Sequence, residues 1–143
     1  METDHKVYLK RNFDCDRATL FKWLTKPELI AQWFGPPRST VTSVSNEVRI
    51  GGSYSIELDS NPHPFSILGC YTEIKAPQTL AFTLQYQGLP DNPPSSQVQL
   101  ILSDVQPGAC ELTLIQRFDF LPNNLADRAT AWKLMFQRLQ NLL

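Results

Sequence analysis

The sequence is poor in the residues from which metal sites and nucleophilic sites are usually built. It contains two histidines, His5 and His63, and three cysteines, Cys15, Cys70 and Cys110. Neither histidine has a partner at metal-ligand spacing, and there is no Ser-His-Asp element, P-loop or Gly-rich dinucleotide-binding loop. We therefore expect no metal and no cofactor, and we assign no catalytic residue. Cysteines in odd number without a CxxC pair are typical of free thiols in a reducing cytoplasm, and we expect them to pack as small core residues.

An excess of one charge and a long apolar run are lacking as well. The chain has 13 basic and 14 acidic residues, so it has no surplus positive charge with which to bind nucleic acid. No apolar stretch approaches the ~20 residues of a membrane span, and the charged opening METDHKVYLKRNF does not resemble a signal peptide. These features predict a cytoplasmic protein. With 143 residues, 42% of them hydrophobic, we expect one domain over residues 1–143 with a single core.

The opening part of the chain changes from a strand pattern to a helix pattern. HKVYLKRNF alternates as a strand does, whereas DCDRATLFKWL spaces its apolar side chains three and four residues apart. Asp14 or Asp16 is placed to cap the start of this helix. In the next stretch, TKPEL, Thr25 and Glu28 have the spacing of a capping box, and Pro27 fits only a first helical turn. We expect a second short helix to begin here.

Two bulky aromatic side chains, Trp33 and Phe34, stand at the exit of that second helix, directly before Gly35 and two prolines. Glycine readily adopts the left-handed conformation that ends a helix, and proline cannot extend one. The aromatic pair is therefore held at a rigid chain reversal. We expect these side chains to form part of the wall of an internal apolar cavity, and the alternative is that they pack as ordinary core.

Residues 39–120 have the pattern of strands separated by short turns. The apolar side chains alternate in SYSIELD, TLAFTLQY, QVQLILSDV and CELTLIQRF. Consecutive strands joined by short turns form an antiparallel meander. The candidates for the inward face are Tyr54, Ile56, Leu58, Leu80, Phe82, Leu84, Val98, Leu100, Leu102, Cys110, Leu112 and Leu114.

The last segment, residues 123–143, predicts one long amphipathic helix. Trp132, Met135, Phe136 and Leu139 recur at three- and four-residue spacing, with charged and amide side chains opposite. An antiparallel sheet with one wet face must cover its other face, and this helix is the element long enough to do so. The order strand, two short helices, six strands and long helix therefore predicts an α+β fold in which a curved sheet wraps round the last helix.

This order of elements, together with several sequence stretches, resembles a known family. The stretches are PELIAQWFGP, VRIGGSYSIEL, GCYTEIKAPQTLAFTL and AWKLMFQRLQNLL. They resemble the activator of Hsp90 ATPase homologue 1-like family, which belongs to the START-like (Bet v 1-like, SRPBCC) superfamily. The resemblance implies a helix-grip fold, in which a seven-stranded curved antiparallel sheet grips the C-terminal helix. It also implies a cavity between sheet and helix, which members of the superfamily use for lipids, sterols, polyketides and other apolar molecules.

The same resemblance raises the question of a chaperone partner. The eukaryotic co-chaperone of this family has an additional N-terminal domain that contacts Hsp90. We find no such domain in this sequence and therefore do not expect a co-chaperone role. Membership of a fold does not by itself fix function.

From these features we predict a non-enzymatic protein that binds a small apolar or aromatic molecule between the sheet and the last helix. Gln116 is the polar exception on the inward face, and we expect it to orient the ligand. The alternative is that Gln116 is a satisfied polar group of the core. The predicted ligand-binding residues are Trp33, Phe34, Tyr54, Ile56, Phe82, Leu102, Leu114, Gln116, Trp132, Met135 and Phe136.

An enzyme is one alternative to this prediction. A cyclase-like or hydrolase-like enzyme using the cavity would need an acid or a base inside it. Glu73 or Asp104 would supply that group if either faced inward. Strict alternation places Glu73 with Tyr71 on the side of the sheet away from Cys70, where the carboxylate is solvated.

A protein-interaction module, Hsp90-related or acting in a stress response, is the other alternative. Such a module would need an exposed apolar patch. The places to look for one are Leu142 with Leu143, at the chain end, and the proline-rich loop of residues 89–96. An edge strand or the outer side of the last helix would be the surface for a homodimer.

Overall fold

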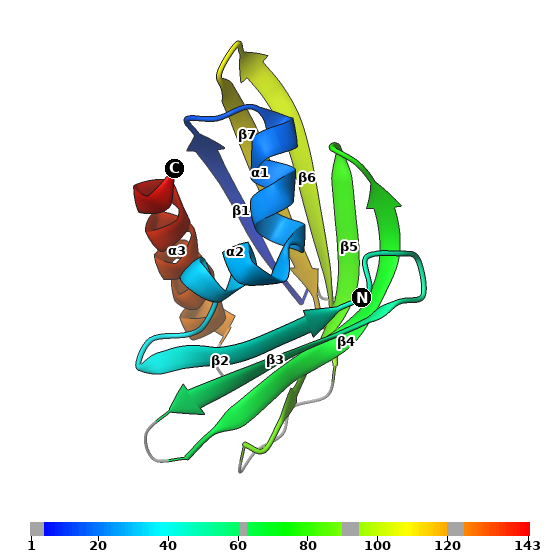
Figure 1. Ribbon diagram of the computed structural model, residues 1–143, viewed down its shortest axis with the longest axis vertical. Helices are drawn as coiled ribbons and strands as arrows, with labels where there is room; N and C mark the ends of the chain where they lie inside the picture. The colour runs from blue at the N-terminus through cyan, green and yellow to red at the C-terminus, as the bar shows by residue number, and fades with distance from the viewer. Residues whose placement is uncertain (1–4, 61–62, 90–94, 120–124) are drawn as a thin grey trace.

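The computed structural model describes residues 5–60, 63–89, 95–119 and 125–143. Within these residues, seven strands form one antiparallel sheet in the order β1-β7-β6-β5-β4-β3-β2, which curves round three helices (Figure 1). In chain order the elements are β1 (Lys6–Phe13), α1 (Arg17–Thr25), α2 (Pro27–Trp33), β2 (Ser39–Asn46), β3 (Ser53–Ser60), β4 (Phe65–Lys75), β5 (Thr79–Gln87), β6 (Ser96–Gln106), β7 (Ala109–Arg117) and α3 (Leu125–Leu142). The predicted α+β helix-grip fold is confirmed. The first two residues of the predicted last helix lie outside the described ranges.

Helix α3 buries the apolar stripe that its sequence predicts. Trp132, Met135, Phe136 and Leu139 are all at most 5% exposed and face the sheet and α2. At the β1 edge of the sheet, the ring of Phe136 meets Phe13 edge-on, with the two ring centroids 6.0 Å apart. Because the helix lies along β1, the opposite half of the sheet, strands β3 to β5, curves away from it (Figure 1).

A β-bulge in β4 breaks the strict alternation that the sequence pattern predicts. The register between β4 and β5 shifts between Tyr71 and Glu73. The bulge lies after Tyr71, which is 4% exposed and faces the core in alternation with the buried Phe65 and Ile67, while Cys70 is exposed on the outer face. The prediction that Tyr71 points with Glu73 away from the core is therefore wrong, and so is the prediction that Cys70 is a core residue. A bulge inserts one extra residue and reverses the facing of the residues beyond it, which a period of two cannot anticipate.

The capping box predicted at the start of α2 is not formed. Thr25 instead ends α1, and its hydroxyl donates to a backbone carbonyl of that helix at 2.8 Å. Lys26 takes the capping position of α2 without a side-chain hydrogen bond, and Pro27 occupies the first turn as predicted. Of the two aspartates considered for α1, Asp16 is the cap, since its carboxylate accepts the backbone N–H of Thr19 at 2.8 Å.

Candidate functional site

The chain reversal after α2 is fastened to α3. Arg138 Nη1 donates to the carbonyl oxygens of Trp33 at 2.9 Å and Gly35 at 3.3 Å, and the Gly35 N–H points to Met135 Sδ at 3.2 Å. Gly35 has a φ of 124°, and a Cβ there would lie 2.9 Å from the nearest side-chain oxygen, so glycine is required. The last carbonyls of a helix have no intrahelical partner. Arg138 therefore caps α2 and fixes where Trp33 and Phe34 lie.

Aromatic rings from this corner and from α3 pack against one another. The Phe34 ring meets Trp132 edge-on at a centroid distance of 6.1 Å, and Trp132 packs on Phe136 at 5.6 Å. Trp33 is tied in from the other side, because its Nε1–H donates to the Trp23 carbonyl at 2.9 Å. Phe34 and Trp132 form a shared wall, with one cavity on each side of it.

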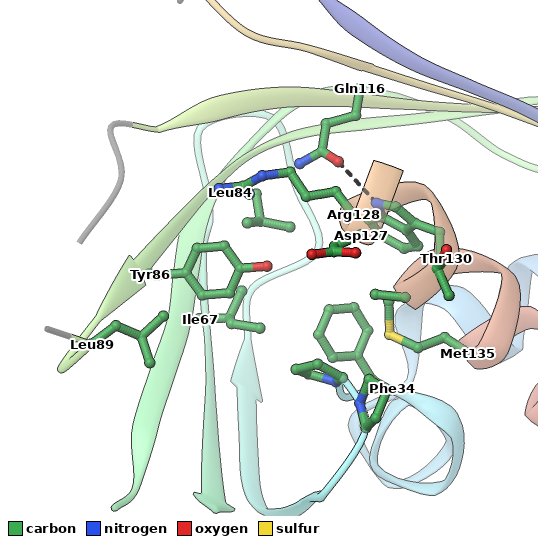
Figure 2. Close-up of a pocket in the computed structure, with 14 residues that line it drawn as sticks. Phe34, Ile67, Leu84, Tyr86, Leu89, Gln116, Asp127, Arg128, Thr130 and Met135 are labelled. Carbon is green, nitrogen blue, oxygen red and sulfur yellow. Dashed lines mark hydrogen bonds between the residues drawn. The ribbon is translucent and has the colours of Figure 1, made fainter. Parts of the chain in front are cut away.

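Gln116, the polar residue of the inward face, holds the indole of Trp132. Its Oε1 accepts the Trp132 Nε1–H at 2.9 Å (Figure 2). Its Nε2 donates to Ser96 Oγ at 2.8 Å. All three residues are at most 4% exposed. The side chain is thus hydrogen-bonded within the core, and it also borders the larger of the two cavities. Gln116 is thus a satisfied polar group of the core, and its role in orienting a ligand stays a prediction.

The larger cavity, called the outer cavity below, lies between the sheet and the N-terminal half of α3 (Figure 2). Its volume is about 580 Å³. Its mouth is bordered by the exposed residues Pro37, Asp127 and Thr130, and by the half-buried Arg128. The complete lining is Phe34, Pro36, Pro37, Ile67, Leu84, Tyr86, Leu89, Gln116, Asp127, Arg128, Thr130, Ala131, Trp132 and Met135.

The smaller cavity, called the inner cavity below, lies behind Phe34 and Trp132. Its volume is about 40 Å³, and aromatic and aliphatic side chains line it. The hydroxyl groups of its two tyrosines are already satisfied: Tyr54 donates to the Thr83 carbonyl at 2.7 Å, and Tyr71 lies 3.0 Å from Asn46 Nδ2. Apolar voids of this kind stay dry.

The structure divides the predicted ligand-binding residues into three groups. Phe34, Gln116, Trp132 and Met135 line the outer cavity. The inner cavity is lined by Trp33, Tyr54, Ile56 and Phe82, again with Phe34 and Trp132. The remaining three, Leu102, Leu114 and Phe136, are at most 2% exposed and belong to the core outside both cavities.

Several residues that line the outer cavity were not predicted from the sequence, although some carried a usable signal. Leu84 and Tyr86 continue the alternation of Phe82 along β5. Arg128 stands four residues before Trp132, and Ala131 stands four residues before Met135, so both extend the buried stripe of α3 toward its start. The prolines of the chain reversal gave no such signal, because their facing depends on the path of the loop.

The charged residues at the mouth of the outer cavity, Asp127 and Arg128, both belong to α3. The Arg128 guanidinium lies 5.8 Å from the ring centroid of Tyr86 and 5.1 Å from that of Phe118, within the range of cation–π contacts. Burial raises the pKa of the Tyr86 hydroxyl, and the positive charge of Arg128 opposes this shift. Asp127, the neighbouring residue, is exposed to solvent.

The two carboxylates considered for an enzyme find partners at the surface. Asp104 Oδ1 lies 3.1 Å from Arg17 Nε, and Glu73 Oε2 lies 3.4 Å from Lys75 Nζ. Within the part of the chain that the structure describes, no three His, Cys, Asp or Glu side chains gather where they would hold a metal ion. None of the described helices is long and apolar enough to cross a membrane. What the outer cavity offers is an apolar chamber with a polar mouth.

Solved structures of other proteins share this fold. A protein of Nitrosomonas europaea matches with a TM-score of 0.82 and 18% identity, over 100% of this chain and 96% of that one. The AHSA1 protein of Silicibacter pomeroyi matches with a TM-score of 0.80 and 22% identity, over 96% of each chain. The AHSA1-like protein of Aeromonas hydrophila matches with a TM-score of 0.78 and 15% identity, over 95% and 90%. At such identities the likeness shows the fold alone.

The sequence itself identifies the family. The comparison with curated proteins gave no match. The family described as activator of Hsp90 ATPase homolog 1-like protein matches residues 14–143, which is most of the chain. The resemblance seen in the sequence stretches is therefore confirmed, and the chain belongs to the activator of Hsp90 ATPase homolog 1-like family.

Proposed function

We propose that this protein binds a small apolar molecule in the outer cavity. The observation that carries the proposal is a chamber of about 580 Å³ between sheet and α3, open at a polar mouth. Sites for small molecules commonly measure about 300–1,000 Å³, with mainly apolar walls and a few placed polar groups. The walls here are largely aromatic and aliphatic, and the polar side chains stand at the mouth and at Gln116.

The apolar walls also set the scale of affinity. A drug-sized ligand gains about 0.3 kcal/mol per non-hydrogen atom, so a ligand of about 20 atoms gains about 6 kcal/mol. That free energy corresponds to a dissociation constant of roughly tens of micromolar. The amide of Gln116 is already engaged by Trp132 and Ser96, so it adds little to this figure.

A role as a protein-interaction module has less support. Leu142 and Leu143 are 41% and 37% exposed, as expected for such a role, but single exposed apolar side chains are common on protein surfaces. Residues 90–94 of the proline-rich loop lie outside the described residues.

Binding of the fluorescent apolar dye N-phenylnaphthylamine would test the proposal. Ala131 is half-buried and lines the outer cavity, so Ala131→Phe places a ring in empty space and reduces the room for a ligand. The matched control is Leu134→Phe, at a residue of the same helix that is 46% exposed and lies outside the cavity. We expect saturable binding to the wild type and to Leu134→Phe, weakened about tenfold or more by Ala131→Phe.

Both variants must first give the circular dichroism and cooperative unfolding of the wild type. The proposal fails if the folded wild type does not enhance the fluorescence of the dye. It also fails if the two variants bind the dye equally well, because binding would then take place outside the cavity.

A further inference from the structure

The mouth of the outer cavity indicates what the polar end of a ligand should be. We propose that the ligand carries a carboxylate or a similar oxyanion, which Arg128 engages while the apolar body fills the outer cavity. The inference rests on the proposed function, because it concerns the same cavity. It adds the chemical class of the ligand, an amphipathic anion, and the residue that selects it.

The position of Arg128 supports this assignment. The side chain starts on α3 and reaches across the mouth toward β5, where the guanidinium lies 5.8 Å from the Tyr86 ring centroid (Figure 2). The guanidinium also lies 5.1 Å from the ring centroid of Phe118, which follows β7. The Arg128 side chain therefore bridges the helix and the sheet, over the apolar walls that Ile67 and Leu84 contribute to the cavity. A ligand seated in the cavity has its outer end next to this group.

The surroundings of Arg128 favour an anion with planar oxygens. The guanidinium lies within cation–π distance of two aromatic rings, whose faces attract its positive charge. A guanidinium has five N–H donors, so it engages a carboxylate in addition to the contacts that it already makes. The Tyr86 hydroxyl, which burial keeps protonated, stands at the same cavity as a neutral donor.

A cationic ligand is disfavoured by the same geometry. The carboxylate at the mouth, Asp127, is exposed, so water screens its attraction for a cation. Arg128 is half-buried at the same mouth, so the charged end of a cationic ligand would lie beside a positive group. Of these two charged residues that line the cavity, Arg128 is therefore the one whose charge water screens less.

Three probes with the same apolar chain and different ends would test the inference. Decanoate, decanol and decylamine are compared by their displacement of bound N-phenylnaphthylamine from the wild type, Arg128→Gln and Lys133→Gln. Lys133 is exposed on α3 outside the cavity, so its replacement is the control for the loss of one positive charge. We expect decanoate to bind the wild type about tenfold more tightly than decanol, as one charge-assisted contact at a partly exposed site would give.

The variants separate the charge of Arg128 from its packing. In Arg128→Gln, decanoate should fall to the affinity of decanol while decanol is unchanged, and Lys133→Gln should alter neither. If Arg128→Gln is too unstable to assay, added salt should weaken decanoate and not decanol in the wild type. If the wild type binds decanoate and decanol equally well, or binds decylamine most tightly, the inference is overturned while the proposed function still stands. Equal weakening of all three probes by Arg128→Gln overturns it too, and failure of all three to bind the wild type overturns the proposed function itself.

Discussion

The hydrogen bond between Gln116 and Trp132 is expected to stabilise the wall between the two cavities, and its removal gives a measurable prediction. Gln116→Leu keeps the approximate size of the side chain but takes the acceptor away from a buried indole N–H, which is 2.9 Å from Gln116 Oε1. A buried donor left without a partner costs about 1–3 kcal/mol. We expect Gln116→Leu to lower the free energy of unfolding by about 2 kcal/mol.

The reverse change, Trp132→Phe, removes the donor instead. Loss of part of a ring that is 4% exposed costs about 2 kcal/mol through lost packing. The orphaned Gln116 Oε1 costs less than the orphaned indole, because Gln116 borders the outer cavity and water from that cavity can donate to it. In the double variant both the indole donor and the amide acceptor are gone, so neither is left buried without its partner, and the two losses should not add. We expect about 3 kcal/mol in total, which is a coupling energy of about 1 kcal/mol.

Urea unfolding followed by far-ultraviolet circular dichroism measures all four proteins without relying on tryptophan emission, which Trp132→Phe alters. Equal slopes against urea would show that the compared states are the same. If the double variant loses the sum of the single losses to within about 0.4 kcal/mol, the two residues are independent. The reasoning that Gln116 holds the indole in place would then be refuted.

Three further predictions concern the sheet, a helix cap and the thiols. Gly69→Ala should lower the free energy of unfolding by about 3 kcal/mol in urea, because its Cβ would lie 1.9 Å from the Thr83 carbonyl oxygen, and a loss below about 1 kcal/mol would contradict that crowding. Hydrogen bonds from α1 lower the pKa of Asp16, so its stabilising effect is present above the unfolded-state pKa and is lost as pH falls through the folded-state pKa; urea unfolding of Asp16→Ala should differ from wild type at neutral pH and converge with it in acid. Ellman's reagent should label the exposed Cys70 rapidly in the native protein, whereas Cys110, 0% exposed with its pKa raised to about 12 by burial, should react only on unfolding.

The parts of the fold that arise from periodicity could be predicted from the sequence. The stripe of Trp132, Met135 and Phe136 and the alternation along β3, β5, β6 and β7 are consequences of burying one face, so they are visible without a structure. The bulge between Tyr71 and Glu73, which puts these two residues on opposite faces, was not predictable in this way, because it is an interruption of the period. Leu102 and Leu114 were correctly placed inside, but their sequence pattern does not distinguish core from cavity wall.

The volume of the outer cavity is the property that sequence reasoning could least supply. It depends on how far the sheet curves away from α3. The same sequence pattern fits a ring such as Phe34 that fills this space and one that only borders it. Phe34 and Trp132 border both cavities, so under the proposed function they would set the depth to which a ligand enters. A ligand longer than the outer cavity would have to displace the Trp132 indole, and Gln116 would resist that movement through its hydrogen bond. Ligand length and the strength of this one contact are therefore linked, and Gln116→Leu should extend binding toward longer apolar chains.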